Sequence, residues 1–323
     1  MLKMDSKTIR FLARMGARGT LGQAVYDYAR EGNDFFAVSA DLAHASGFDR
    51  IIKEYPDHFV DVGIAEQNLI GVSAGLAEMG TPVIATSWAM FTSVRAADQV
   101  RNFMGYMQAN IKLIGMDSGL IQSRFGYSHG NPPDIAVMRS IPGIVIMSPC
   151  DGVEVYKSLE AALKYDGPVY IRLTGGNLQP IIHRDQAIPF SIGKSITLKE
   201  GKDVAIAACG NIVKNVMDAA AVLEDQGVSA KVIDMHTVNP LDTEILEEIA
   251  KMNLLVSVEE HLIHGGMGAA IAEYYADKKV RPRHVLAGID NCYPLPGRVS
   301  YTEETYGLSV RQIAERVMAE LQK

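Results

Sequence analysis

The chain has 323 residues, of which 48% are hydrophobic and 21% charged, and a formal net charge of −7. This length suits two domains of about 150 residues each, and the absence of a Lys/Arg block argues against a nucleic-acid partner. Because no apolar run approaches the ~20 residues of a membrane span and the N-terminus lacks the apolar core of a signal peptide, we expect a soluble, cytoplasmic protein with no membrane partner.

Short apolar runs alternate with amphipathic stretches from about residue 35 onward. The apolar runs predict strands at residues 35–42, 81–88, 111–116, 143–149 and 168–173. The stretches between them predict helices at 64–79, 91–107, 135–140 and 153–165, the last with Asp151 as its N-cap. Such alternation is typical of a mainly parallel sheet covered by helices on both faces.

A stretch rich in Gly, Pro and His interrupts this pattern around residues 175–195, and a second series follows it. The second series predicts strands at 203–209, 229–235, 254–261 and 284–289, and helices at 212–225, 243–252, 267–275 and 310–322. We therefore predict two tandem α/β domains with mainly parallel sheets, at residues 1–180 and 196–323, joined by a linker at 181–195.

The three cysteines, Cys150, Cys209 and Cys292, lie far apart and form no CxxC pair. Their spacing predicts neither a disulfide framework nor a zinc site. We expect no metal ligands from this chain.

Two segments carry residues suited to chemistry. Residues 61–68, DVGIAEQN, set Glu66 among small and apolar residues at the start of a predicted helix. On this segment alone two interpretations stay open, a first-turn carboxylate that interacts with the helix dipole or a functional acid. Residues 87–91, SWAMF, place Trp88 and Phe91 after an apolar strand, which by itself is typical of a core.

Taken in order and at this separation, the two segments resemble the pyrimidine-binding domain of transketolases. The resemblance continues through DSG at 117–119, Ser128-His129 and residues 134–154. In the second half, VIDMHTVNPLD at 232–242 and VSVEEH at 256–261 resemble the transketolase C-terminal domain. The similarity runs from about Arg18 to the end of the chain.

This resemblance implies thiamine diphosphate as the cofactor, whose own imino group removes the proton at C2. It makes Glu66 the catalytic carboxyl that hydrogen-bonds the pyrimidine N1′ and has to hold a proton there. Phe91 would stack on the aminopyrimidine, with Trp88 lining the same pocket and Asp41 also binding the cofactor. His129 would be a catalytic and substrate-binding imidazole.

The family's diphosphate-binding half has a Gly-Asp-Gly motif and a later Asn, and this sequence offers only Cys150-Asp151-Gly152 with Asn177, which we regard as coincidence. The resemblance therefore implies a complementary subunit that binds the diphosphate through Mg²⁺ or Ca²⁺. Because the cofactor would lie between two different chains, we expect two copies of each around a two-fold axis, a heterotetramer.

The residues that hold the substrate's terminal phosphate in the family are partly replaced. Gly175, Met116 and Ala45 stand where the family has donors. Arg18 matches one of the family's arginines. Arg124 lies near the place where the family has an acidic sequence that this chain lacks. Either the two arginines rebuild the anion site, or the distal group is a sulfonate or an uncharged polyol end.

Two other functions remain open on the sequence. The β subunit of a 2-oxo-acid dehydrogenase shares the two-domain arrangement and the activating Glu, although the AEQN setting of Glu66 and residues 232–242 favour a transketolase. A non-catalytic α/β partner subunit is the second alternative, against which the set Glu66, Phe91 and His129 argues.

Overall fold

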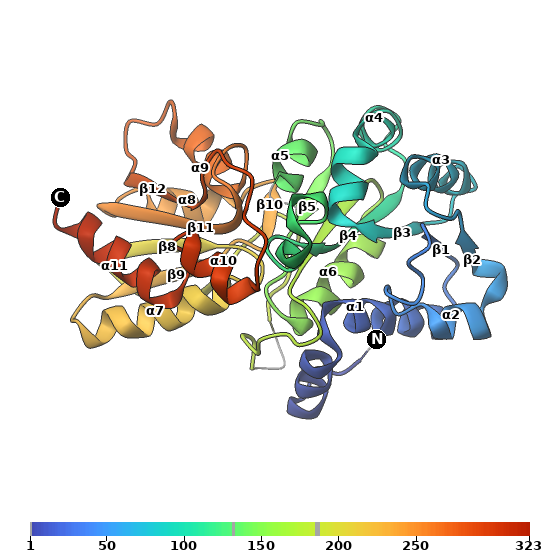
Figure 1. The fold of residues 1–323 in the computed structure, drawn as a ribbon, viewed down its shortest axis with the longest axis horizontal. Coiled ribbons are helices and arrows are strands. Elements are labelled where there is room, and N and C mark those ends of the chain that lie inside the picture. The colour runs from blue at the N-terminus through green and yellow to red at the C-terminus, as the bar shows by residue number, and fades with distance from the viewer. Residues whose placement is uncertain (1, 131–132, 185–187) are drawn as a thin grey trace.

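The computed structural model describes residues 2–130, 133–184 and 188–323. It shows two α/β halves side by side, the first coloured blue to green and the second yellow to red in Figure 1. Each half has its own sheet, with helices above and below it. The predicted fold class is confirmed.

A seven-stranded sheet in the order β10-β5-β6-β4-β3-β1-β2 organises the first half. Its strands are β1 (Phe36–Ser39), β2 (Phe59–Asp61), β3 (Val83–Trp88), β4 (Ile111–Ser118), β5 (Val145–Met147), β6 (Val169–Thr174) and β10 (Thr237–Asn239). All neighbours are parallel except β10, which comes from the second half of the chain and pairs antiparallel with β5. The five predicted strands are present, whereas β2 and β10 have three residues each and show no recognisable pattern.

The first half contains a long N-terminal helix that the sequence pattern did not predict. The helices here are α1 (Ser6–Arg30), α2 (Asp49–Glu54), α3 (Glu66–Ala77), α4 (Ala97–Gln99), α5 (Asp134–Arg139) and α6 (Gly152–Lys164). The chain of α1 bends at Gly16, where φ is 71° and an added Cβ would lie 2.5 Å from the carbonyl oxygen of Gly176. Because only glycine permits this approach, α1 passes directly against the loop after β6 and brings Arg18 to it.

The region predicted as one helix at 91–107 is irregular. Two π-helical segments, Phe91–Arg95 and Val100–Tyr106, flank the short α4. Each π turn adds a residue to the helical repeat and so turns the following side chains to a new direction.

The second half has a five-stranded sheet in the order β12-β11-β8-β9-β7, in which only β7 is antiparallel. Its strands are β7 (Ile196–Lys199), β8 (Val204–Ala208), β9 (Ala230–Asp234), β11 (Leu254–Leu262) and β12 (Arg283–Ile289). Its helices are α7 (Val213–Asp225), α8 (Thr243–Ile249), α9 (Met267–Tyr275), α10 (Val299–Thr305) and α11 (Val310–Leu321). The predicted strands and helices are confirmed, and β7 and α10 are additional. Within the described ranges no helix has the length and apolar character to cross a membrane.

One buried apolar cluster extends across the junction of the halves. Ile135 and Met138 of α5 and Ile146 of β5 belong to the same cluster as Met235 and Val238 of the second half. Together with the β10 pairing, this shared core fixes the position of the second half against the edge of the first sheet.

Candidate functional site

Glu66 opens α3 at the edge of the first sheet where the carboxyl ends of β1, β2 and β3 meet. The turn before it is held by Asp61, whose Oδ1 accepts the N–H groups of Asp41 (3.0 Å) and Gly63 (2.8 Å). Asp41, predicted to bind the cofactor, is exposed at this turn with φ 57°. Glu66 is only 3% exposed. The first turn of a helix stabilises a carboxylate at this position.

Arg95, which the sequence patterns did not single out, contacts Glu66 directly. Its Nη1 donates to Glu66 Oε2 at 2.8 Å, and Ser87 Oγ donates to Oε1 at 3.4 Å. The Glu66 side chain therefore lies in more polar surroundings than the small and apolar residues next to it in the sequence predicted. The side chain of Arg95 is 47% exposed, so the pair joins a buried carboxylate to a cation at the surface.

The predicted aromatic and imidazole residues gather beside this pair. The Arg95 guanidinium lies 3.9 Å from the centre of the Phe91 ring, and the Phe91 and His129 rings meet edge to face at 5.4 Å. His129 Nδ1 and Ser128 Oγ are 3.0 Å apart. Glu66, Phe91 and His129 thus come together through contiguous contacts. Trp88 lies at the end of β3 and contacts Arg18, whose guanidinium is 5.5 Å from its ring.

A pocket of about 310 Å³ lies between the two halves and brings Arg18 and Arg124 together. Arg298, from the loop before α10, lines it from the second half, and Asp117 and Asn177 line it from the first. Arg18 donates to Asn177 Oδ1 (3.2 Å) and lies 3.5 Å from Asp117. Three guanidinium groups thus accompany one carboxylate, which gives the pocket a positive balance suited to an anion.

A chain of side-chain contacts joins Arg124 of this pocket to the Phe91 ring. Arg124 lies 4.7 Å from the ring of Phe125, and that ring lies 5.4 Å from His129. Burial raises the pKa of Asp117, an effect that the neighbouring Arg18 and Arg124 oppose. The arginine pocket and the Phe91–His129 pair are therefore linked through Phe125.

The structure explains why the family's terminal-phosphate donors are absent at Gly175 and Met116. Gly175 has φ 83°, and an added Cβ would lie 2.0 Å from the amide of Asn211, so an arginine there would be strained and would have to displace that amide. Met116 is fully buried, and its sulfur accepts the hydroxyl of Ser46 at 3.4 Å. Neither position can supply a donor to the pocket. Arg298, which the sequence patterns did not single out, supplies one from the other half.

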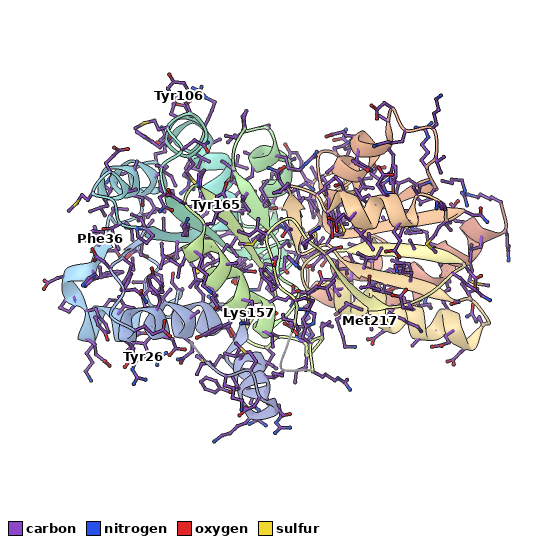
Figure 2. The ribbon with its side chains drawn as sticks, turned by 180° about the vertical axis from the view of Figure 1, so that it is seen from behind. Tyr26, Phe36, Tyr106, Lys157, Tyr165 and Met217 are labelled. Atoms are coloured by element: carbon purple, nitrogen blue, oxygen red, sulfur yellow. The ribbon has the colours of Figure 1, made fainter. Side chains whose placement is uncertain are left out.

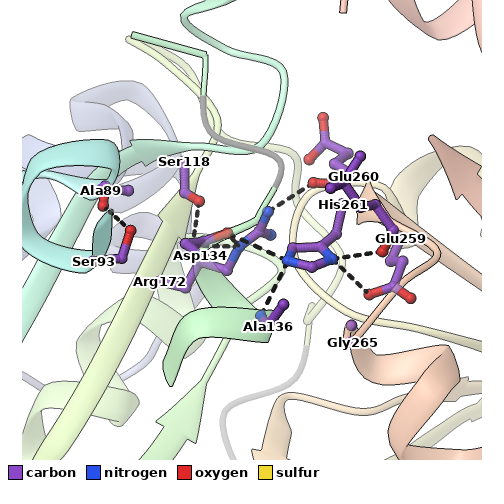
Figure 3. Close-up of polar contacts among 12 residues, drawn as sticks. Ala89, Ser93, Ser118, Asp134, Ala136, Arg172, Glu259, Glu260, His261 and Gly265 are labelled. Carbon is purple, nitrogen blue, oxygen red and sulfur yellow. Dashed lines mark hydrogen bonds and ion pairs between the residues drawn. The ribbon is translucent and has the colours of Figure 1, made fainter. Parts of the chain in front are cut away.

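A buried ion pair between Arg172 and Asp134 of the first half lies at the junction of the halves, and Arg172 also bonds to the second half (Figure 3). Arg172 Nε lies 2.9 Å from Asp134 Oδ2, and its Nη2 donates to the carbonyl oxygen of Glu260 at 2.7 Å. Ser118 Oγ also donates to Asp134 at 2.6 Å, which anchors the end of β4, where Asp117 lies. Breaking such a pair strands a buried charge, so this network keeps the pocket in shape.

A second contact across the same junction joins His261 to α5. Burial lowers the pKa of His261 to about 4, so its ring is neutral near pH 7. The neutral ring accepts the N–H of Ala136 at its Nε2, 3.3 Å away. This bond satisfies a backbone donor in the first turn of α5 with a side chain of the second half.

Large apolar side chains are exposed in the loop before α3 and along the two π segments that pack against α3. Ile64 lies in the loop before α3, and Val94, Tyr106 and Met107 lie in or beside the two π segments that pack against α3. Tyr106 is 88% exposed and projects outward in Figure 2. Such a concentration of exposed apolar groups is typical of a surface that another chain covers.

Asp151, the centre of the incomplete diphosphate motif, serves the fold. It caps α6 by accepting the N–H of Glu154 and also accepts the N–H groups of Ile182 and His183. It is almost fully buried. Its oxygens are therefore engaged within the protein.

Two family models match the chain. One, described as the transketolase pyrimidine binding domain, matches residues 14–180. The other, described as the transketolase C-terminal domain, matches residues 193–313.

Curated proteins and solved structures give the same result over nearly the full chain. The chain is 35% identical over 298 residues to a 6-deoxy-6-sulfo-D-fructose transketolase subunit of Clostridium sp., covering 92% of this chain and 91% of that protein. It is 32% identical over 310 residues to an apulose-4-phosphate transketolase subunit of Phocaeicola vulgatus, covering 96% and 98%. A solved chain described as a split gene transketolase, inactive beta4 tetramer, superposes with a TM-score of 0.86 at 33% identity, covering 95% and 99%.

Proposed function

The chain belongs to the transketolase family, and we propose that it is the pyrimidine-binding subunit of a thiamine-diphosphate-dependent transketolase made of two kinds of chain. The enzyme would move a two-carbon ketol unit from a ketose to an aldose. In this proposal residues 1–180 bind the pyrimidine, 181–195 form the linker and 196–323 form the C-terminal domain. The supporting observation is that Glu66, Phe91 and His129 lie together at one sheet edge.

The geometry beside Phe91 suits the ring of the cofactor. Arg95 places a flat guanidinium on the face of Phe91 and in hydrogen-bond contact with Glu66. An aminopyrimidine is likewise flat and polar at its edge, so it could make the same two contacts once Arg95 turns away. Trp88 and Asp41 remain candidate cofactor residues at the same sheet edge.

When bound, thiamine diphosphate supplies the carbon nucleophile of the reaction. The residues of this chain would hold the pyrimidine by stacking on Phe91 and by a hydrogen bond between Glu66 and the ring nitrogen N1′. Glu66 would keep a proton at that nitrogen, and His129, beside Phe91, would exchange protons with the substrate.

A second kind of chain would complete the site. The relatives from Clostridium sp. and P. vulgatus are each named as a subunit of a transketolase, and the exposed apolar side chains around α3 offer a surface for a partner. We propose that this partner binds the diphosphate through Mg²⁺ or Ca²⁺ and that the enzyme contains two copies of each chain.

The substrate class follows from the arginine pocket. Arg18, Arg124 and Arg298 together suit a terminal phosphate or sulfonate, since a planar guanidinium pairs with either anion. The relatives are named for a sulfonated sugar and for a sugar phosphate, one of each class. We therefore propose sugars with a terminal anion and set aside the uncharged polyol end.

The alternatives fit less well. The matching family models and the relatives described above carry transketolase names, which favours ketol transfer over a 2-oxo-acid dehydrogenase β subunit. A non-catalytic partner subunit would have no use for a carboxylate, a phenyl ring and an imidazole brought together through Arg95.

Reconstitution tests the proposal. The chain is mixed with the diphosphate-binding subunit of the same genome, thiamine diphosphate and Mg²⁺, and ketol transfer between anionic ketoses and aldoses is followed by product analysis. We expect transfer by the mixture and none by either chain alone. Turnover by the single chain would refute the two-chain assignment, and oxidation of 2-oxo acids without ketol transfer would establish the dehydrogenase alternative.

A further inference from the structure

Four potential metal-binding side chains meet where the linker passes between the two halves. Cys150 precedes α6, Glu154 lies in its first turn, His183 belongs to the linker and Asp234 ends β9. All four are buried, none more than 5% exposed. One donor atom from each lies within 4.8 Å of the other three. The cluster thus draws on three separate segments of the chain.

The Nε2 atom of His183 lies at the centre of the cluster. It is 3.0 Å from Glu154 Oε1, 3.8 Å from Cys150 Sγ and 3.8 Å from Asp234 Oδ2. Around a tetrahedral zinc ion with bonds of about 2.0–2.3 Å, donor atoms lie roughly 3.3–3.7 Å apart. The observed spacing is close to that requirement, so small rotations of the side chains would close the set around one ion.

The surrounding hydrogen bonds hold these donors in place. Asp151 accepts the backbone N–H of His183 at 2.9 Å and that of Glu154 at 3.0 Å. Glu154 Oε2 accepts the N–H of Cys150 at 2.9 Å, which leaves Oε1 directed at the imidazole. Outer contacts of this kind orient ligands in metal sites.

Asp234 supplies an independent indication of a ligand. It is fully buried, yet neither of its carboxylate oxygens has a hydrogen-bond partner at ordinary distance within the described structure. The charge of Asp234 faces the thiol of Cys150 and the imidazole of His183. Glu154 lies closer to that imidazole than Asp234 does. A buried carboxylate without close hydrogen bonds is costly, and two acids sharing one imidazole leave negative charge that a divalent cation would neutralise.

We propose that Cys150, Glu154, His183 and Asp234 form a structural site for one Zn²⁺ ion. Thiolate, imidazole and carboxylate are the donors that zinc takes in tetrahedral sites, and four protein ligands leave no open position for catalysis. On binding, the Cys150 thiol and the protonated His183 imidazole each release a proton to solvent as the sulfur–zinc and nitrogen–zinc bonds form. The ion would fasten the linker to both halves. The proposed zinc site is separate from the site around Glu66. It would exist whether or not the chain takes part in ketol transfer.

Cobalt substitution tests the site in the full-length chain. The chain is produced in cells supplied with Zn²⁺ or with Co²⁺, and metal content and visible absorption are measured after purification. We expect one metal per chain, a thiolate-to-cobalt charge-transfer band, tetrahedral cobalt absorption and a higher thermal midpoint for the metal-loaded chain. A wild-type chain that takes up no stoichiometric metal, or that binds cobalt without the thiolate band, overturns the proposal.

Variants locate the ligands. Cys150→Ser should abolish the thiolate band and weaken zinc binding by at least about a hundredfold. Losing a residue that only orients a ligand costs up to about a hundredfold in metal affinity, and losing the ligand itself should cost at least as much. Asp234→Asn should weaken zinc binding by at least about tenfold. Cys292→Ser changes the exposed cysteine outside the cluster and should leave both properties intact. A band that persists in Cys150→Ser excludes this cluster, and the wild-type measurement still decides if that variant does not fold.

Discussion

Arg95 pairs with Glu66 at 2.8 Å while its guanidinium covers the face of Phe91 at 3.9 Å. These are the two contacts proposed for the pyrimidine ring of the cofactor. Arg95 and the cofactor therefore compete for one position. Because about half of the Arg95 side chain is exposed, it can turn into solvent and leave Glu66 to a new partner.

Removing this competitor should strengthen cofactor binding. In the assembled enzyme we expect Arg95→Ala to bind thiamine diphosphate about 1.4- to fivefold more tightly, because half-exposed ion pairs are worth about 0.2–1 kcal/mol. Titration calorimetry measures the change. Arg101→Ala, which removes an exposed arginine paired with Asp98, is the matched control. Weaker binding by Arg95→Ala would instead make Arg95 a ligand of the cofactor.

Glu66 should control proton exchange at C2 of the cofactor. We expect Glu66→Gln to slow hydrogen–deuterium exchange there by about 10²–10⁴-fold, the usual range for a positioned acid–base group. Exchange is followed by NMR in the assembled complex. Glu78→Gln, at the opposite end of α3, is the control and should exchange at the wild-type rate. If Glu66→Gln does the same, Glu66 is only a first-turn carboxylate.

Arg298 should discriminate substrates by their terminal charge. We expect Arg298→Ala to raise KM at least about tenfold for phosphate- or sulfonate-terminated sugars and to change little for a short neutral ketol donor, since a charge-assisted hydrogen bond is worth about 1.5–3 kcal/mol. Arg124→Ala should act in the same direction. Arg311→Ala, an exposed arginine of the same half, serves as control. Equal effects on charged and neutral substrates would place the mutated arginine outside the substrate pocket.

Glu260 should make stability depend on pH. Burial raises its pKa from 4.5 to about 7, and its Oε2 has no hydrogen-bond partner within the described structure. Below pH 4.5 the group is protonated in both the folded and the unfolded state and has no effect. Between pH 4.5 and 7 the unfolded chain loses this proton first, so stability falls by up to about 1.4 kcal/mol per pH unit, and the full penalty remains above pH 7.

Replacing this acid by its amide isolates the effect. We expect Glu260→Gln to match the wild type at about pH 4 and to exceed its free energy of unfolding at about pH 8, as measured by urea denaturation. Glu315→Gln, which changes an exposed acid, should match the wild type at both values. Identical unfolding of Glu260→Gln and wild type at high pH would show that burial does not destabilise the Glu260 carboxylate.

Sequence patterns predicted the helices and strands whose buried faces produce a regular spacing of apolar residues. The long strands appear as apolar runs, but α1 was missed because Gly16, Gly19 and Gly22 interrupt its helical pattern. The association of Glu66 with His129 came from family resemblance, since no local pattern reports a contact between distant segments.

The missed site residues have physical reasons of their own. Arg95 lies four residues after Phe91, so those two side chains meet within one helical segment, whereas its pairing with Glu66 joins two separate segments that no local pattern relates. Arg298 lies in an irregular loop and enters the pocket only through the packing of the two halves. The proposed zinc ligands lie on separate segments without a common spacing, so no motif indicates them.

The strand Thr237–Asn239 gives the first half a dependence on the second. It covers the outer edge of β5 in a sheet otherwise built from residues that precede the linker. A fragment cut at the linker would present that edge unpaired, together with the apolar surface now shared with the second half. Unpaired edges recruit strands from neighbouring molecules, so such a fragment would be prone to aggregate. The halves are therefore poor candidates for separate expression or for exchange between relatives as interchangeable modules.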